Sequence, residues 1–331
     1  MEAYIKDIEY YLPEKIITNE ALATEFPEWS AEKIFRKVGI QQRHIAADNE
    51  TATDMAEKAA QKLFFSGVEK DDIDFILFCT QSPDYKLPPS ACILQDRLGL
   101  KKSVGALDFD LGCSGYVYGL SLAKGLVVCG MAKNVLLLTA ETYNKYIHPS
   151  DKGNRTIFGD GASATLVSVE GEARIGEFAF GTDGSGANDL IVPNGGAKAD
   201  YGKDNHVTDK PIVYPDNIFM DGSDIFSFTL KVVPQLIDQV MEKNGDKKEN
   251  MDLFVMHQAN RYMLDFLRQK MKITEEKMFI NLENIGNTVS STVPIALKDA
   301  LDKQIINRGD KVAIAGFGVG LSWAGCELFF K

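Results

Sequence analysis

The chain has 331 residues, of which 45% are hydrophobic and 25% are charged, as is typical of a globular protein. Its formal net charge of −11 argues against nucleic acid as the main partner, because phosphate contacts need a basic surface. We also expect no membrane span, because the sequence has no run of about 18 apolar residues.

The cysteines and the first residues bear on where the protein works. Its five cysteines are scattered without CxxC spacing, which predicts neither a zinc site nor a disulfide framework. The N-terminal residues lack a basic stretch followed by an apolar one, so we expect no secretory signal. Together these features favour a reducing cytoplasm.

Short apolar, β-branched runs alternate with segments of helical spacing along the chain, which indicates an α/β protein. In chain order, a charged and aromatic excursion occupies residues 26–44, and apolar strands are predicted at 72–80, 132–141 and 159–169. A helix is predicted to begin beside Cys113, between the first and second of these strands.

The second half of the chain repeats this pattern. Three of its segments resemble the three predicted strands, at an offset of about 178 residues for the first pair (72 to 250): 250–258, 309–318 and 318–330. We therefore predict an internal duplication, with one half at 1–172 and the other at 173–331. The polar segment 192–217 interrupts the second half and is predicted to be a surface loop.

The stretch DLGCSGYVYGL places Cys113 between Gly112 and Ser114, directly before the predicted helix. Glycine lets the backbone turn sharply and lets a substrate approach closely. A helix N-terminus also lowers the pKa of a thiol, and the thiolate is the nucleophile. We therefore predict that Cys113 is a nucleophile, whereas we expect the other cysteines to be inert, buried hydrophobes: Cys79, Cys92, Cys129 and Cys326.

Two polar residues of the second half qualify as partners of Cys113. His257 follows an apolar strand in VMHQAN, and Asn287 lies in IGNTVSSTVP, in the segment that corresponds to the helix after Cys113. If the halves pack about a pseudo-twofold axis, both residues approach Cys113 at strand ends and helix N-termini, where α/β folds place their sites. Two alternatives remain: His257 as a structural histidine and Asn287 as a helix N-cap.

A set of Cys, His and Asn without a carboxylate differs from the triad of a hydrolase, in which an acid orients the histidine base. An amide donates hydrogen bonds, so His257 and Asn287 together can stabilise an oxyanion at a thioester carbonyl. The glycines of GFGVGLSWAG (316–325) superficially suggest a dinucleotide fingerprint, but too few residues follow for a βαβ unit. We instead predict a hairpin that brings backbone N–H groups near Cys113.

These motifs resemble those of the thiolase superfamily, and specifically of the β-ketoacyl-acyl-carrier-protein synthase III family. The resemblance runs through nearly the whole chain and rests on GIQQRHIA, PPSAC, DLGCSGYVYGL, IFGDGASA, MHQAN, GNTVSSTVP and GFGVGLSW. It implies a thiolase-like fold in which two duplicated βαβ-containing halves pack as five αβαβα layers. It also implies a catalytic triad of Cys113, His257 and Asn287, and an oxyanion hole formed by the N–H groups of Cys113 and Val319.

The reaction that the resemblance implies has two stages and initiates fatty acid synthesis. Cys113 takes an acyl group from acyl-coenzyme A, and malonyl-acyl carrier protein then loses CO₂ and attacks the enzyme thioester in a decarboxylative Claisen condensation. We expect a homodimer that needs neither a metal nor a redox cofactor. The alternatives are an acyltransferase or condensing enzyme of a specialised pathway with a non-acetyl donor, a thioester hydrolase, and a non-catalytic binding paralogue.

The resemblance also implies a coenzyme A site. Trp29 is expected to stack on adenine or, alternatively, to cap the small core of its own loop. Lys37 and Lys152 stand where the family often has arginines, and a lysine keeps the charge but loses the bidentate fork for phosphate. The full implied set is Trp29, Lys37, Lys152, Gly153, Phe226 and Asn260, of which the last two line the pantetheine channel.

Further positions bear on specificity and docking. Leu87 stands where the family often has a phenylalanine that reaches into the partner subunit's acyl pocket, so we expect room for a longer or branched acyl group. Val319 replaces a family glycine, and its N–H can still donate. Basic residues after HQAN are expected either to dock the acidic carrier protein or to form an ordinary solvated face: Arg261, Arg268, Lys270, Lys272 and Lys277.

Overall fold

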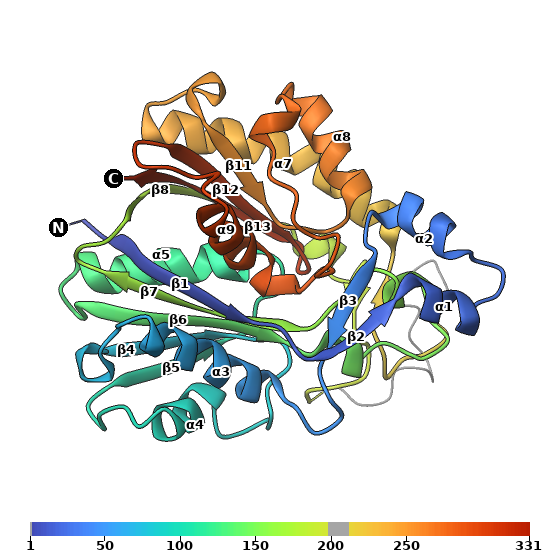
Figure 1. Ribbon diagram of the computed structural model, residues 1–331, viewed down its shortest axis with the longest axis horizontal. Coiled ribbons are helices and arrows are strands. Elements are labelled where there is room, and N and C mark those ends of the chain that lie inside the picture. The colour runs from blue at the N-terminus through green and yellow to red at the C-terminus, as the bar shows by residue number, and fades with distance from the viewer. Residues whose placement is uncertain (1, 198–211) are drawn as a thin grey trace.

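The computed structural model describes residues 2–197 and 212–331 of the chain. Figure 1 shows two layers of strands with helices between them and further helices on both outer sides. The first-half strands are β1 (Tyr4–Tyr11), β4 (Phe75–Cys79), β5 (Gly105–Phe109), β6 (Asn134–Glu141) and β7 (Gly161–Ser168). The second-half strands are β8 (Ala173–Thr182), β11 (Leu253–Met256), β12 (Lys311–Gly318) and β13 (Ser322–Phe330).

Helices form three of the five layers. α3 (Ala52–Phe65) and α4 (Ser90–Arg97) cover the outer face of the first-half strands, and α7 (Gly222–Asn244) and α8 (Arg261–Met271) lie on the outer side of the second half. α5 (Gly115–Val128) and α9 (Thr292–Asp302) lie in the middle, because each contacts strands of both halves. The five αβαβα layers implied by the resemblance are confirmed.

The strands of the described residues are hydrogen-bonded in the order β11-β12-β13-β8-β1-β7-β6-β4-β5. The pairs β4–β5, β4–β6 and β11–β12 are parallel, and the remaining neighbours are antiparallel. The two half-sheets are joined where Tyr4 pairs with Arg174 and Ile5 pairs with Ala173. The carboxyl ends of β4, β5 and β6 therefore lie side by side, and this edge carries the segments around Cys113.

The repeat read from the sequence is present in the strands. The segments matched by sequence contain β4 and β11, β6 and β12, and β7 and β13, and each pair holds the same place in its half-sheet. The counterpart of β5 is reduced to a single bridge between Phe254 and Met278. The boundary expected between 172 and 173 lies where β8 begins, after the turn that follows β7.

α5 is buried between the two half-sheets, which explains why it is apolar on nearly all sides. Its small residues allow close packing on the strands. A Cβ at Gly119 would lie 2.5 Å from a methyl of Leu137 on β6, so only glycine fits there. This packing fixes the start of the helix, and with it the turn that carries Cys113.

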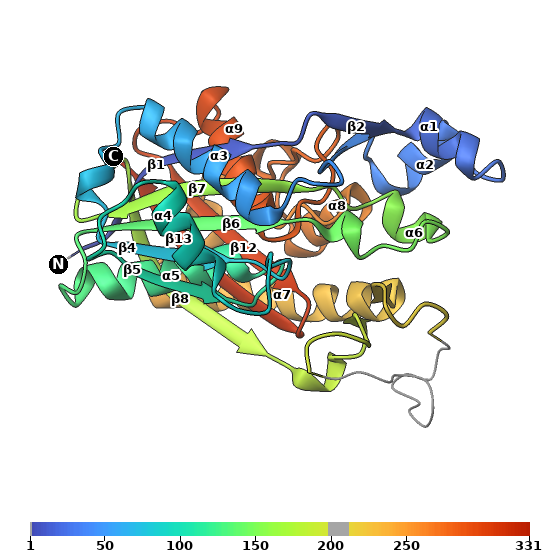
Figure 2. The ribbon, with the colours of Figure 1, turned by 90° about the horizontal axis from the view of Figure 1, so that it is seen from below.

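The excursion expected at 26–44 forms most of an arm at one end of the molecule (Figure 2). The arm consists of β2 (Lys15–Thr18), α1 (Asn19–Glu25), α2 (Ala31–Val38) and β3 (Gln42–Ile45). Ser30 caps α2 by accepting a hydrogen bond from Lys33 N, and Gly39 ends it in the left-handed conformation (φ 69°).

Most of the surface loop expected at 192–217 falls on residues 198–211, which lie outside the described residues. The chain on either side forms a short hairpin in which β9 (Leu190–Ile191) pairs with β10 (Phe219–Met220). None of the helices in the described ranges is both long enough and apolar enough to cross a membrane.

Candidate active site

Cys113 lies in a tight turn between β5 and α5, as its small neighbours predict. Gly115 N donates a hydrogen bond of 2.8 Å to Gly112 O and closes the turn. A Cβ at Gly112 would lie 2.6 Å from a methyl of Val319, so only glycine fits where the two loops meet. The Cys113 side chain is 5% exposed.

The glycine-rich segment after β12 forms the predicted hairpin. β12 pairs antiparallel with β13 up to the pair Gly318–Ser322, and the connecting turn carries Val319. A Cβ at Gly318 would lie 2.8 Å from the sulfur of Cys113. The backbone N–H groups of Val319 and of Cys113 itself both lie near enough to this sulfur to lower its pKa in part. The structure therefore brings together the two N–H groups expected to form an oxyanion hole.

The predicted lowering of the Cys113 pKa is wrong. Burial raises the pKa of the Cys113 thiol to about 12, because a thiolate at this place loses its hydration. The hydrogen bond from Val319 N–H lowers the pKa only in part, and the buried Glu141 raises it further. Two of the cysteines expected to be buried are in fact exposed, Cys92 on α4 and Cys129 at the end of α5.

His257 directly follows β11 and continues its pairing with β12, because its N–H donates to Ala315 O at 2.7 Å. Its Nδ1 lies 2.7 Å from the hydroxyl oxygen of Thr292, and its ring meets the Phe317 ring edge-on at 5.7 Å. Burial lowers the pKa of His257 to about 3, and a hydrogen bond with the Val289 backbone offsets this only in part. The imidazole is therefore neutral near pH 7.

Asn287 is held by its main chain and by its side chain. Its N–H donates to Ile157 O at 3.0 Å, and its Oδ1 accepts from Val289 N at 2.9 Å. One N–H of its amide points to Ala259 O at 3.4 Å, which leaves the second N–H for a ligand. The N-cap alternative is wrong, because Ser291 occupies the N-cap position of α9 and Asn287 lies four residues earlier.

Two short segments bring the three residues together. The segment Phe317–Val319 contacts His257 through its phenyl ring and Cys113 through Gly318 and the Val319 N–H. Val289 N donates to Asn287, and Val289 O is 3.0 Å from the Thr292 hydroxyl that contacts His257. The thiol, the imidazole and the amide are thus assembled by contacts between the two halves of the chain.

Several residues of this site were not foreseen from the sequence. Thr292 contacts the Nδ1 of His257 and donates to Val289 O at 3.0 Å. Val289 itself has a φ of 55°, a conformation that is rare and costly for a β-branched residue. The signal that could have pointed to them is the run of small hydroxyl residues in NTVSST, which is unusual before an apolar helix.

The expected coenzyme A contacts of the arm meet in one place. Trp29, Lys37 and Gly153 line a cleft of about 510 Å³ between the arm and α6 (Lys152–Arg155). Three ammonium groups surround the Trp29 ring, at 4.6 Å for Lys37, 5.4 Å for Lys152 and 5.7 Å for Lys33. The indole is partly buried and packs against a large core cluster that contains residues of the arm and of the second half.

Phe226 and Asn260 lie in the second half instead, near the starts of α7 and α8. Asn260 caps α8 by accepting a hydrogen bond from Met263 N at 2.8 Å. Phe226 stacks on Tyr262 and meets Phe266 edge-on, each at 5.5 Å between ring centroids. Gly222, which begins α7, lines the cleft beside Trp29, so the two groups are connected through α7.

The basic residues after HQAN are less free than the sequence suggests. Arg261 lies 3.4 Å from Asp265 and 3.9 Å from Glu275, and Arg268 lies 3.8 Å from Asp265. Lys270 is in the last turn of α8, Lys272 ends the helix in the left-handed conformation, and Lys277 donates to the backbone of Met251. This face therefore combines positive charge with internal ion pairs.

Leu87 lies between β4 and α4, and its side chain is 82% exposed.

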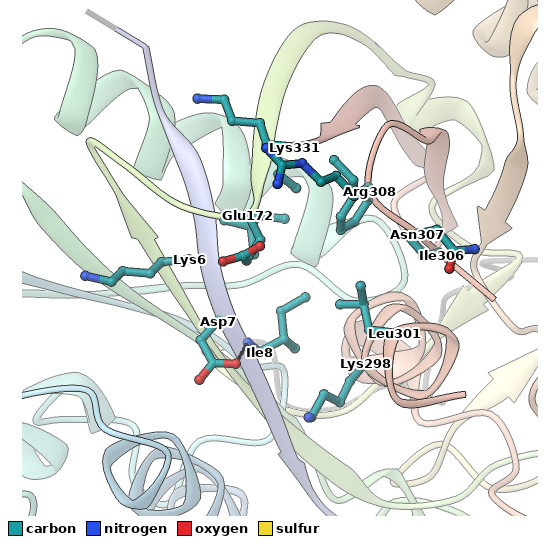
Figure 3. Close-up of a pocket in the computed structure, with 13 residues that line it drawn as sticks. Lys6, Asp7, Ile8, Glu172, Lys298, Leu301, Ile306, Asn307, Arg308 and Lys331 are labelled. Atoms are coloured by element: carbon teal, nitrogen blue, oxygen red, sulfur yellow. Dashed lines mark hydrogen bonds between the residues drawn. The ribbon is translucent and has the colours of Figure 1, made fainter. Parts of the chain in front are cut away.

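A second cleft of about 250 Å³ lies at the opposite end of the molecule from the arm (Figures 2 and 3). Lys6, Glu172, Lys298, Arg308 and Lys331 are among the residues that line it. Lys298 is already paired with Asp302 at 2.7 Å and with Glu9 at 3.2 Å. None of the residues expected to be catalytic lines this cleft, so it is separate from the site around Cys113.

Comparison with known proteins gives a consistent result. Residues 107–184 match the model of the family described as 3-Oxoacyl-[acyl-carrier-protein (ACP)] synthase III, and residues 241–329 match its C-terminal part. A Beta-ketoacyl-[acyl-carrier-protein] synthase III of Caldanaerobacter subterraneus subsp. tengcongensis is 38% identical over 320 residues, which cover 95% of this chain and 93% of the relative.

Solved structures agree with this match. A crystal structure of a 3-oxoacyl-(acyl-carrier-protein) synthase III is 50% identical, with a TM-score of 0.95, and each chain covers 100% of the other. A 3-oxoacyl-(acyl-carrier protein) synthase from Burkholderia xenovorans is 35% identical with a TM-score of 0.92, covering 100% of this chain and 94% of the other.

Proposed function

Because this chain belongs to the 3-oxoacyl-acyl-carrier-protein synthase III family, we propose that it joins an acyl group from acyl-coenzyme A to malonyl-acyl carrier protein. The reaction is a decarboxylative Claisen condensation that starts fatty acid synthesis. The observation that carries the proposal is the meeting of Cys113, His257 and Asn287 around Phe317–Val319 and Val289.

In the first stage the sulfur of Cys113 attacks the thioester carbonyl of acyl-coenzyme A. A bond forms between the sulfur and the carbonyl carbon, the bond to the sulfur of coenzyme A breaks, and the departing thiolate takes up the proton that Cys113 gives up. The N–H groups of Cys113 and Val319 stabilise the negative oxygen of the tetrahedral intermediate. They also hold the sulfur in place, which compensates in part for the high pKa of the buried thiol.

In the second stage malonyl-acyl carrier protein loses CO₂, and the electron pair of the broken bond forms an enolate. His257 and Asn287 donate hydrogen bonds to the enolate oxygen. The neutral imidazole donates from Nε2 when the single proton of the Thr292 hydroxyl turns from Val289 O, 3.0 Å away, to Nδ1 of His257, 2.7 Å away. The enolate carbon then attacks the acyl-Cys113 thioester, and the thiolate of Cys113 leaves. Because decarboxylation supplies the carbanion, the step needs no strong base, no metal and no redox cofactor.

The cleft beside Trp29 is the proposed coenzyme A site. Trp29 supplies a stacking face for adenine, and Lys37 and Lys152 supply positive charge for the phosphates. Gly153 completes the cleft, and Phe226 and Asn260 are the residues proposed to line the pantetheine channel. Arg261, Arg268, Lys270 and Lys272 form the proposed docking face for the acidic carrier protein, although two of them are partly neutralised by Asp265.

We place the enzyme in the cytoplasm as a homodimer. All five cysteines have free thiols, which suits a reducing compartment. β5 ends the sheet order and exposes Leu107 at 47%, as a strand that pairs with a second copy would do. Leu87, which is 82% exposed, would then reach the acyl pocket of the partner subunit and act as its gate.

A panel of acyl-coenzyme A species tests the proposal. Cys113 should gain the acyl mass, seen by intact mass and peptide mapping, and the Cys113→Ala variant should gain none. Addition of malonyl-acyl carrier protein should then release CO₂ and a β-ketoacyl product. Acylation of another cysteine would overturn the role of Cys113, and release of free acid without a carbon–carbon product would indicate a thioester hydrolase.

A further inference from the structure

Glu141 is a buried carboxyl group outside the proposed triad that contacts both halves of the active site. It is the last residue of β6 and is fully buried. At this edge of the sheet it meets the segment that follows β4 and the turn that precedes α9. None of the steps described above uses it.

Within residues 2–197 and 212–331, the hydrogen-bond donors to Glu141 are all neutral groups. Gln81 N donates to both carboxyl oxygens, at 3.0 and 3.2 Å, and the hydroxyls of Ser82 and Ser290 each lie 3.0 Å from one of them. A fully buried carboxylate is costly without a nearby cation, whereas a protonated carboxyl can itself donate to a serine oxygen. The arrangement is thus suited to an uncharged glutamic acid.

One branch of these contacts leads to the Cys113 turn through Gln81. The Gln81 side chain accepts a hydrogen bond from the Tyr143 hydroxyl. Its oxygen would lie 2.6 Å from a Cβ at Gly112, so the amide packs directly on the residue before Cys113. Glu141 therefore fixes the main chain of Gln81, and the Gln81 side chain in turn supports the Cys113 turn.

The other branch joins the two halves through Ser290. This serine directly follows Val289, which hydrogen-bonds Asn287 through its N–H and contacts, through its carbonyl, the Thr292 hydroxyl beside His257. The Ser290 side chain also lies near enough to the Cys79 thiol to lower its pKa in part. The Cys79 sulfur in turn donates to Leu111 O at 2.8 Å, two residues before Cys113.

The charge state of Glu141 is coupled to that of Cys113. Burial raises the pKa of Glu141 to about 8, and the negative charge of Asp110 raises it as well. In return, ionised Glu141 raises the pKa of Cys113. The titratable groups that interact with Glu141 are Asp110, Cys113, Cys79, Tyr143 and Tyr146.

We propose that Glu141 is a positioning residue, which together with Ser290 and Cys79 forms a bridge that holds the Cys113 turn in register with the Asn287 turn. The bridge touches no substrate. The expected effect of losing the bridge rests on the proposed function. Condensation needs both the Cys113 turn and the Asn287 turn, whereas acylation needs only the Cys113 turn and the Val319 N–H. Loss of the bridge should therefore slow condensation more than acylation.

The first test compares the two half-reactions. Glu141→Leu fills the space without hydrogen bonds, and we expect condensation to fall by about 30-fold or more while acylation of Cys113 falls by about 3-fold or less. Ser290→Ala cuts one branch and should shift the same ratio in the same direction, which decides the matter if Glu141→Leu does not fold. An equal fall in both half-reactions, or no fall in either, would overturn the proposal.

The second test uses alkylation of Cys113 by iodoacetamide, followed by peptide mass. Glu141→Gln keeps hydrogen-bonding groups but cannot ionise. Its alkylation rate should equal that of the unmodified chain near pH 6.5, where Glu141 is neutral, and exceed it about 3-fold or more near pH 9, where Glu141 is charged. The same ratio at both pH values would refute the coupling.

Glu327→Gln is the matched control. Glu327 is a fully buried carboxyl of β13, and its charged neighbours include Asp246, Lys311 and Arg174. Its substitution should leave both half-reactions and the alkylation of Cys113 unchanged. The alkylation test needs no substrate, so it tests the bridge even if the chain catalyses no condensation. A failure of condensation would count against the proposed function alone.

Discussion

The two halves of the chain contain equivalent strands and equivalent helices. Where these strands end and these helices begin, however, the two halves carry different chemical groups. In the first half, α5 begins directly after the turn of Gly112, Cys113 and Ser114. In the second half, a 3₁₀ turn (Val289–Ser291) lies between Asn287 and α9. The first arrangement exposes backbone N–H groups to a sulfur, and the second orients an imidazole and an amide.

The difference shows what each kind of group requires from the backbone. A nucleophile at a helix start needs small neighbours, because the substrate and the Val319 loop must approach closely. Oriented side-chain donors need a fixed turn, and here the Asn287 side chain holds Val289 in the left-handed conformation. That strain costs on the order of 1–3 kcal/mol, which the surrounding hydrogen bonds and burial must offset.

The largest expected effect separates the two halves by function. Asn287→Asp replaces the donating amide with an accepting carboxylate, next to the carbonyl oxygen that gains charge. Condensation should fall by about 10²–10³-fold, whereas acylation of Cys113 should change by less than about 3-fold. Single-turnover mass measurements follow the first stage, and release of labelled CO₂ follows the second.

The control for this variant lies in the other half. Cys113→Ala should abolish both stages, because no thioester forms. If Asn287→Asp also blocked acylation, the assignment of the two stages to different halves would be lost.

The next effect concerns stability and compares the buried carboxyls of the two halves, Glu141 and Glu327. Burial, followed by the negative charge of Asp246, raises the pKa of Glu327 to about 7. The unfolded chain ionises this group near its ordinary pKa, so the folded state loses stability as pH rises from about 4.5 to about 7 and then levels off. Glu327→Gln removes this loss. We therefore expect the free energy of unfolding of the variant, minus that of the unmodified chain, to be larger at pH 8 than at pH 5 by about 1–3 kcal/mol, after allowance for solvent screening.

Urea unfolding at the two pH values measures this effect. Glu141→Gln should show the same direction, since burial also raises the pKa of Glu141, to about 8. What separates the two variants is activity, which only the substitution in the first half should change. A Glu327→Gln variant whose stability relative to the unmodified chain is the same at both pH values would contradict the buried charge.

Local sequence patterns predicted much of the site. The glycines around Cys113 predicted its turn, and those after β12 predicted the hairpin that carries Val319, because both motifs depend on residues adjacent in the chain. The repeat of strands predicted that His257 and Asn287 approach from the other half. The fold and these positions were therefore accessible without coordinates.

Other properties depend on residues far apart in sequence. The pKa of Cys113 was predicted in the wrong direction, because its burial depends on the second half packing over the first. The contact between Glu141 and Ser290 joins residues 149 positions apart, and Glu141 stands in none of the recognised motifs. The conformation of Val289 likewise follows from its tertiary partners, since its own β-branched side chain disfavours it.

The smallest expected effect tests how the second half orients its imidazole. Thr292→Val keeps the shape of the side chain but removes the hydroxyl that lies 2.7 Å from Nδ1 of His257 and 3.0 Å from Val289 O. Without this partner, neutral His257 is no longer held as the form with a proton on Nε2, so condensation should fall by up to about 10-fold. Thr292→Ser retains the hydroxyl and should restore most of the rate. Because burial lowers the pKa of His257 to about 3, neither variant should gain an acid limb near pH 6. If the rate of the unmodified chain instead fell with acid near pH 6, His257 would be charged in part. A charged imidazole carries a proton on both nitrogens, so its donation from Nε2 would not depend on Thr292.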